Sequence, residues 1–195
     1  MIRKILLTLL LALGISQSAH ADTATGMPDM NAAMADMQKG MALLPYITAP
    51  IENNDKLTSK DVELFLEVVK KGDSSYGKYM DGIEKGNEKA AQVLKPGVSF
   101  DTFIKKSIEL SGLKNELDKE AESIGYDDAL DLTLKSTRII RAMVAVMMEK
   151  EIAKAPKEQQ AMMRNMMSGM TGKSKPEDIE TVKPYADQLK QMMGQ

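Results

Sequence analysis

The fold is decided by residues 128–154, DALDLTLKSTRIIRAMVAVMMEKEIAK. At 1.5 Å per residue, this stretch would form a helix about 40 Å long. Its middle is almost entirely apolar, and the apolar side chains cover an arc of about 200° when they are placed at 100° per residue. These side chains are Ile139, Ile140, Met143, Val144, Val146, Met147 and Met148. Such an arc is too wide for a helix lying on a surface, so we expect a long central helix that other elements surround.

The other segments repeat their apolar residues at intervals of three and four, which is the period of an α-helix. We therefore predict an all-α protein, an irregular bundle of about six to eight helices around the helix at 128–154. Proline and glycine mark the expected boundaries of several of these helices. The first helix is expected to begin near Pro28 and to end before Pro45, and a glycine-interrupted helix at 74–95 is expected to be weak or bent.

Short polar motifs predict where individual helices start. Thr58 and Asp61 have the spacing of a capping box, which predicts a helix that runs to Gly72. Ser99 and Ser111 are each predicted to cap the helix that follows. Pro156 is predicted to end the central helix and to open a shorter one that reaches about Ser168.

Residues 1–21 have the three parts of a secretory signal peptide. Arg3 and Lys4 supply the positive start, residues 5–15 form the apolar stretch, and Ala19-His20-Ala21 is a small-residue cleavage motif. We expect cleavage between Ala21 and Asp22 and a bacterial periplasmic or secreted protein. The apolar stretch is shorter than the roughly 20 residues that span a bilayer, and no later uncharged run reaches that length. No transmembrane segment is therefore expected after cleavage.

Removal of residues 1–21 would leave residues 22–195, a chain of 174 residues that suits a single helical domain. Glycine and lysine concentrate at 169–175, which is the one stretch whose composition suits a subdomain boundary. Residues 169–195 could accordingly form a loosely attached helical appendage at the C-terminus.

Composition excludes several classes of function. The chain has no cysteine, and its one histidine, His20, lies in the signal segment. The mature chain therefore lacks the residues for a Cys/His zinc site, a cysteine nucleophile or a Ser-His-Asp triad, and we predict no enzyme activity and no such cofactor. It would carry 24 basic and 28 acidic residues. That balance gives no basic excess to attract nucleic acid.

Methionine is the residue type that stands out, with 17 copies in the full chain. Two clusters have helical spacing. The first would lie within about 80° of one helix face, and the second would spread over about 140°. The first cluster is Met27, Met30, Met34, Met37 and Met41, and the second, which we call the methionine face, is Met162, Met163, Met166, Met167 and Met170.

Three interpretations of these clusters are open. Flexible thioether side chains adapt to partners of different shape, so the methionine face could bind an apolar protein segment, as in a binding or chaperone-like module. Soft sulfur ligands also select Cu(I) and Ag(I), and either cluster, Met27 to Met41 or Met162 to Met170, has sulfurs spaced to share one ion. Finally, methionine can simply fill the gaps between packed helices, the role that the narrow arc of the first cluster suits.

Two arginines, Arg138 and Arg141, interrupt the apolar centre of the long helix. They could hold an anionic ligand. The interpretation that we favour from the sequence is that they lie at the boundary of the core, with their apolar stems buried and their charges in water.

Overall fold

The computed structural model describes residues 30–70 and 80–192. These residues form helices joined by irregular segments and contain no strand, which confirms the predicted all-α bundle. The predicted signal peptide at 1–21, the residues at 71–79 and Met27 lie outside the described residues. Within the described ranges, no helix combines the length and the apolar character that are needed to cross a bilayer.

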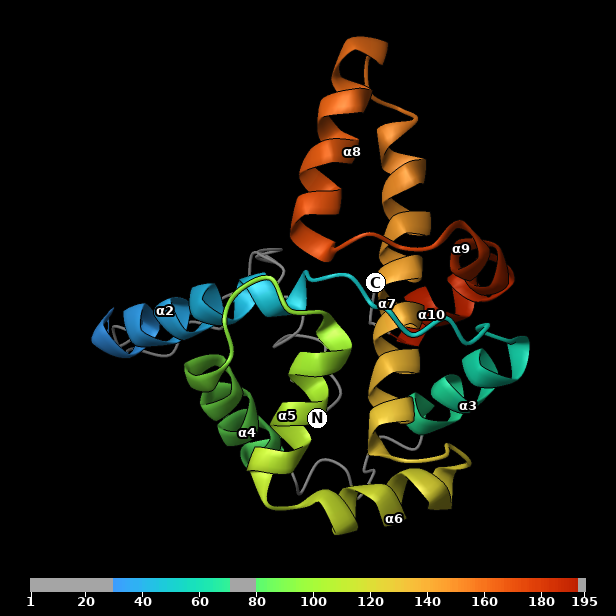
Figure 1. The fold of residues 1–195 in the computed structure, drawn as a ribbon. Helices are drawn as coiled ribbons and strands as arrows, with labels where there is room; N and C mark the ends of the chain where they lie inside the picture. Colours follow the sequence, from blue (N-terminus) through green and yellow to red (C-terminus); the bar gives the residue numbers. More distant parts are fainter. Residues whose placement is uncertain (1–29, 71–79, 193–195) are drawn as a thin grey trace, which may run out of the picture.

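Figure 1 shows how the helices follow one another along the chain. Their bounds are α2 (Met30–Ile47), α3 (Ser59–Lys70), α4 (Met80–Val93), α5 (Phe100–Ser111), α6 (Lys114–Ile124), α7 (Ala129–Ile152), α8 (Lys157–Thr171), α9 (Pro176–Val182), the 3₁₀ turn η2 (Lys183–Tyr185) and α10 (Ala186–Met192).

Helix α7 is the predicted central helix, and it lies between two apolar cores. α2, α4, α5 and α6 contribute to the first core, which includes Tyr46, Ala90, Phe103, Leu117 and Leu134 of α7. α3, α9 and α10 contribute to the second core, which includes Phe65, Ile139, Met143, Val182 and Leu189. Figure 1 shows α2, α4 and α5 on one side of α7, α3 and α9 on the other side, and α6 across its lower end. The wide apolar arc is therefore needed because α7 is covered on two sides.

Local capping signals place two of the helix starts. The Thr58 backbone N–H donates to Asp61 Oδ2 at 2.8 Å, and the Asp61 N–H donates to Thr58 Oγ1 at 3.3 Å, so the predicted capping box is confirmed. Ser99 also caps as predicted, because its Oγ accepts from the Thr102 N–H at 3.3 Å. The prediction for Ser111 was wrong: α6 starts at Lys114 without a side-chain cap, and Ser111 ends α5 and accepts from the Leu113 N–H.

The prediction that the first helix ends before Pro45 was also wrong, because α2 continues to Ile47. A proline inside a helix costs about 3 kcal/mol, since it removes one hydrogen bond and crowds the preceding turn. Tertiary contacts of the next residue offset this cost. The Tyr46 ring stacks on Phe103 with centroids 4.8 Å apart, and its hydroxyl donates to the Leu94 carbonyl at 2.7 Å.

The C-terminal helices are joined to α7 by buried side chains. Val182 of α9 is fully buried and Leu189 of α10 is nearly so, and both belong to the second core. Asp178 of α9 is also buried. The described part of residues 169–195, the segment for which we considered a loose attachment, thus supplies several buried side chains to the fold.

Candidate functional site

The methionine face belongs to α8, which forms a hairpin with the C-terminal part of α7. The turn between the two helices is closed by a hydrogen bond from the Ala155 N–H to the Ile152 carbonyl at 3.0 Å. Gln160 Nε2 donates to the Ala155 carbonyl at 2.9 Å, and Arg164 of α8 pairs with Glu149 of α7 at 2.6 Å. Figure 1 shows that this hairpin extends beyond the other helices. Much of the α8 surface therefore faces away from the two cores.

The sequence alone did not show whether the methionine face is covered. Met162 is 67% exposed and Met166 is 60% exposed, whereas Met163 is half-buried. The side chains of Met167 and Met170 lie outside the described part of the structure. One edge of the methionine face, formed by Met162 and Met166, is therefore open to solvent.

The exposed edge has a simple chemistry. Met162 and Met166 are four residues apart, so their thioethers lie one turn apart on the same side of α8. Such a surface offers apolar, polarisable contacts and two soft sulfur atoms. Among the described residues, no group of three or more His, Cys, Asp or Glu side chains could hold a metal ion.

The first methionine cluster is described only in part. Met41 is exposed on α2. Met27 and the side chains of Met30, Met34 and Met37 lie outside the described residues. Its predicted roles in packing or in metal binding therefore stay predictions.

A second polar site lies at the middle of α7, where Arg138 and Arg141 are each only 4% exposed. The interpretation of these arginines as boundary residues with solvated charges was wrong. Arg138 forms a two-pronged ion pair with the buried carboxylate of Asp178, in which Nε donates to Oδ2 at 2.8 Å and Nη2 donates to Oδ1. Its Nη1 donates to the backbone carbonyl of Asp55. These partners come from distant parts of the sequence, so the spacing within α7 could not reveal them.

Arg141 has a different set of partners. Its Nη1 donates to the Ala49 carbonyl at 3.1 Å, and its Nη2 donates to the Ile47 carbonyl. The guanidinium also lies 5.1 Å from the centre of the Phe100 ring, within range of a cation–π contact. Burial lowers the pKa of Arg141 to about 10, and the negative charge of Asp101 opposes this shift. Its buried charge is thus held mainly by neutral groups.

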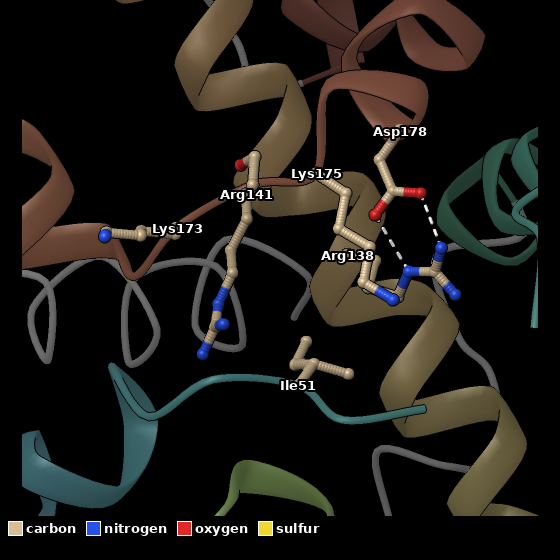
Figure 2. A pocket seen from close by; sticks show the side chains of 7 residues that line it. Ile51, Arg138, Arg141, Lys173, Lys175 and Asp178 are labelled. Atoms are coloured by element: carbon tan, nitrogen blue, oxygen red, sulfur yellow. Dashed lines mark hydrogen bonds and ion pairs between the residues drawn. The ribbon is translucent and has the colours of Figure 1, made fainter. Parts of the chain in front are cut away.

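These arginines border a small pocket of about 20 Å³, which we call the basic pocket. Figure 2 shows it between α7, the segment containing Ile51 and the linker from α8 to α9. The lining residues are Ile51, Arg138, Arg141, Lys173, Ser174, Lys175 and Asp178. Four of them are basic and one is acidic.

The irregular segment at 48–58 closes one side of the basic pocket. Arg141 donates to the carbonyls of residues 47 and 49, and Arg138 donates to that of residue 55. Lys175 Nζ donates to the carbonyl of residue 53 at 2.8 Å. From the other side, Asp101 accepts from the backbone N–H groups of Glu52 at 2.9 Å and Asn53 at 2.8 Å. The segment is thus held between α5 and the centre of α7 by charge-assisted hydrogen bonds.

One signal for this site was visible in the sequence, the pair of arginines at the apolar centre of the long helix. No such signal was visible for Asp178 or for the carbonyls of residues 47–55. No family model, curated protein or solved structure matches the chain.

Proposed function

We propose that this protein is an exported, non-catalytic binding protein whose methionine face holds an apolar segment of a partner or client protein. The observation that carries the proposal is the exposure of Met162 and Met166 on a helix that extends beyond the rest of the bundle. Large apolar side chains that remain in water next to one another are typical of interaction surfaces. The predicted signal peptide would send the protein to the bacterial periplasm or outside the cell.

The chemistry of the face favours a partner segment of variable shape. Methionine has three rotatable bonds and a polarisable sulfur, so the same surface can repack around different apolar side chains. The exposed edge lies away from the contact between the two helices, because Met162 and Met166 are more than half exposed whereas Ile152 at the end of α7 is fully buried. The edge can therefore change its side-chain conformations while α8 stays in place.

A matched pair of variants tests the proposal. Met162→Glu/Met166→Glu puts two charges on the exposed edge, whereas Ala161→Glu/Asn165→Glu puts the same charges one residue earlier, about 100° around the helix. All four positions are exposed, so both variants should fold. The readout is the suppression of light scattering by a heat-denatured test protein.

We expect the exported wild-type protein and the Ala161/Asn165 variant to suppress aggregation, and the Met162/Met166 variant to require a several-fold higher concentration. Equal suppression by both variants, or no suppression by the wild-type protein, would refute the proposal. Circular dichroism of each variant shows whether the helices are retained.

The alternative is a Cu(I)- or Ag(I)-binding protein, favoured by the position of Met162 and Met166 on one side of α8. Replacing all five methionines of the face by leucine keeps the apolar bulk and removes the sulfur. Suppression that survives this replacement supports the binding proposal. Stoichiometric Ag(I) binding that is lost on replacement supports the alternative.

A further inference from the structure

We infer that the basic pocket is a binding site for a tetrahedral oxyanion of the phosphate or sulfate type. Charge is the first argument. Four basic side chains line the pocket, and its one carboxylate, Asp178, is already engaged by both prongs of the Arg138 guanidinium. Arg141, Lys173 and Lys175 thus border the pocket without a carboxylate partner in its lining, and Figure 2 shows the Lys173 side chain pointing away from Arg141.

Arg141 carries the second argument. Its guanidinium is buried and donates hydrogen bonds to two backbone carbonyls, which carry only partial negative charge. Burial lowers the pKa of Arg141, and the negative charge of Asp101 only partly opposes this effect. The positive charge of Arg141 is therefore not fully balanced by its surroundings. A bound anion would supply the missing charge and would accept further hydrogen bonds from the guanidinium, which has five N–H donors.

The two lysines differ in how far they are engaged. Lys175 Nζ donates to the Asn53 carbonyl at 2.8 Å and to Asn54 Oδ1 at 3.2 Å, which uses two of its three donors. Lys173 is exposed and has no hydrogen bond or ion pair with another described residue. Lys173 is therefore the basic residue of the pocket that can turn toward a ligand without giving up a structural contact.

The size of the pocket limits how the ligand enters. A space of about 20 Å³ holds one water molecule or one oxygen atom. One oxygen of the anion would occupy it beside Arg141, and the rest would lie outward, toward Lys173. A dianion balances the three cations better than a carboxylate does, which is why we favour the phosphate and sulfate type.

The linker over the pocket is built for close approach. Gly172 has a φ of +75°, and a Cβ atom added there would lie 2.8 Å from Cζ of Arg141 and 3.0 Å from the Thr48 carbonyl oxygen. Only glycine allows the backbone to pass this close to the guanidinium. This passage brings Lys173 and Lys175 to the same pocket as Arg141.

Thermal unfolding at constant ionic strength tests the inference. Inorganic phosphate or sulfate replaces chloride in steps, so that charge screening stays constant, and the midpoint Tm is followed by circular dichroism. Both anions also stabilise folded proteins generally by exclusion from the surface, but that effect grows without saturating, whereas binding at one site saturates. A ligand that binds only the folded state at ten times its Kd should raise Tm by about 3–6 °C, and the rise should saturate. The variant is Lys173→Gln, and the matched control is Lys183→Gln, an exposed lysine outside the pocket.

We expect equal Tm values for all three proteins in chloride, a saturable rise for the wild-type and Lys183→Gln proteins, and a roughly tenfold weaker apparent affinity for Lys173→Gln. The same rise in Lys173→Gln, or a response to phosphate and sulfate no larger than that to chloride, would overturn the inference. Phosphoserine distinguishes the source of the ligand. Affinity equal to that of free phosphate indicates the terminal group of a larger molecule, and weaker affinity indicates the free ion.

Discussion

Replacing Asp178 by asparagine should strongly destabilise the protein, although the asparagine side chain has almost the same size and shape as the aspartate side chain. The side chains of Arg138 and Asp178 are 4% and 2% exposed, so both charges are almost entirely removed from bulk water in the folded state. The substitution keeps the volume of the side chain but leaves the Arg138 charge without its carboxylate. The acceptors that remain for Arg138 would be neutral oxygens, the Asp55 carbonyl and the asparagine amide oxygen.

The size of the effect follows from this burial. Removing one partner of a buried ion pair costs about 3–5 kcal/mol, because the other charge stays buried and uncompensated. A protein of this size is stable by about 5–15 kcal/mol, so the loss is a large part of the total. With a urea dependence of about 2 kcal/mol per molar, the unfolding midpoint should fall by about 1.5–2.5 M.

The assay is urea unfolding at pH 7, followed by far-UV circular dichroism. Glu149→Gln is the control, because it makes the same acid-to-amide change in an ion pair with Arg164 whose side chains are about half exposed. Water replaces the lost contact there, so its midpoint should hardly move. A double variant, Arg138→Met/Asp178→Leu, removes both charges and should recover most of the stability that Asp178→Asn loses.

A midpoint for Asp178→Asn that falls no further than that of Glu149→Gln would refute the reasoning. It would mean that water or another group compensates Arg138 in solution. A double variant that is less stable than Asp178→Asn would show instead that the ion pair is needed for packing between α7 and α9.

Two further predictions concern other parts of the fold. Gly86→Ala should lower the Tm, because the added Cβ would overlap the Ser107 carbonyl oxygen where α4 packs on α5, a type of overpacking that costs about 1–3 kcal/mol. Gly40→Ala, which meets no atom within 4 Å inside α2, should leave the Tm unchanged or raise it, and a lower Tm for this variant would contradict the packing argument. Burial alone would raise the pKa of the Asp61 carboxyl. Hydrogen bonds from Thr58 and the ion pair with Lys135 outweigh burial and hold this pKa below its usual value of 3.8. The stabilising effect of Asp61 is therefore present above about pH 4 and is lost as the pH falls through the lowered pKa, so the difference in urea midpoint between wild type and Asp61→Asn should shrink between pH 5 and pH 2.

Local signals explain how much of the fold could be predicted. The predicted helix at 128–154 corresponds to α7 at Ala129–Ile152, because its apolar residues repeat with helical period from one turn to the next. The caps at Ser99 and at the Thr58–Asp61 pair depend on residues three positions apart. The prediction failed at Pro45, where the local preference to end a helix is outweighed by the contacts of Tyr46 with Ala91 of α4 and Phe103 of α5.

The candidate sites were less predictable, for two physical reasons. Helical spacing shows which methionines share a side of α8, but it carries no information on whether another helix covers them. The exposure of Met162 and Met166 became known only from the packing of the hairpin. The basic pocket depends on contacts between distant residues, such as the 40 positions between Arg138 and Asp178.

The helices, the central helix among them, and the residue types available for chemistry can be read from the sequence, because they depend on composition and on contacts within a turn or two. Which charges are buried and which apolar side chains stay in water depends on how the helices pack. Burial is a property of the assembled chain. Lys175 donates a hydrogen bond to the carbonyl of Asn53, which lies 122 positions earlier, and no local sequence pattern predicts that contact.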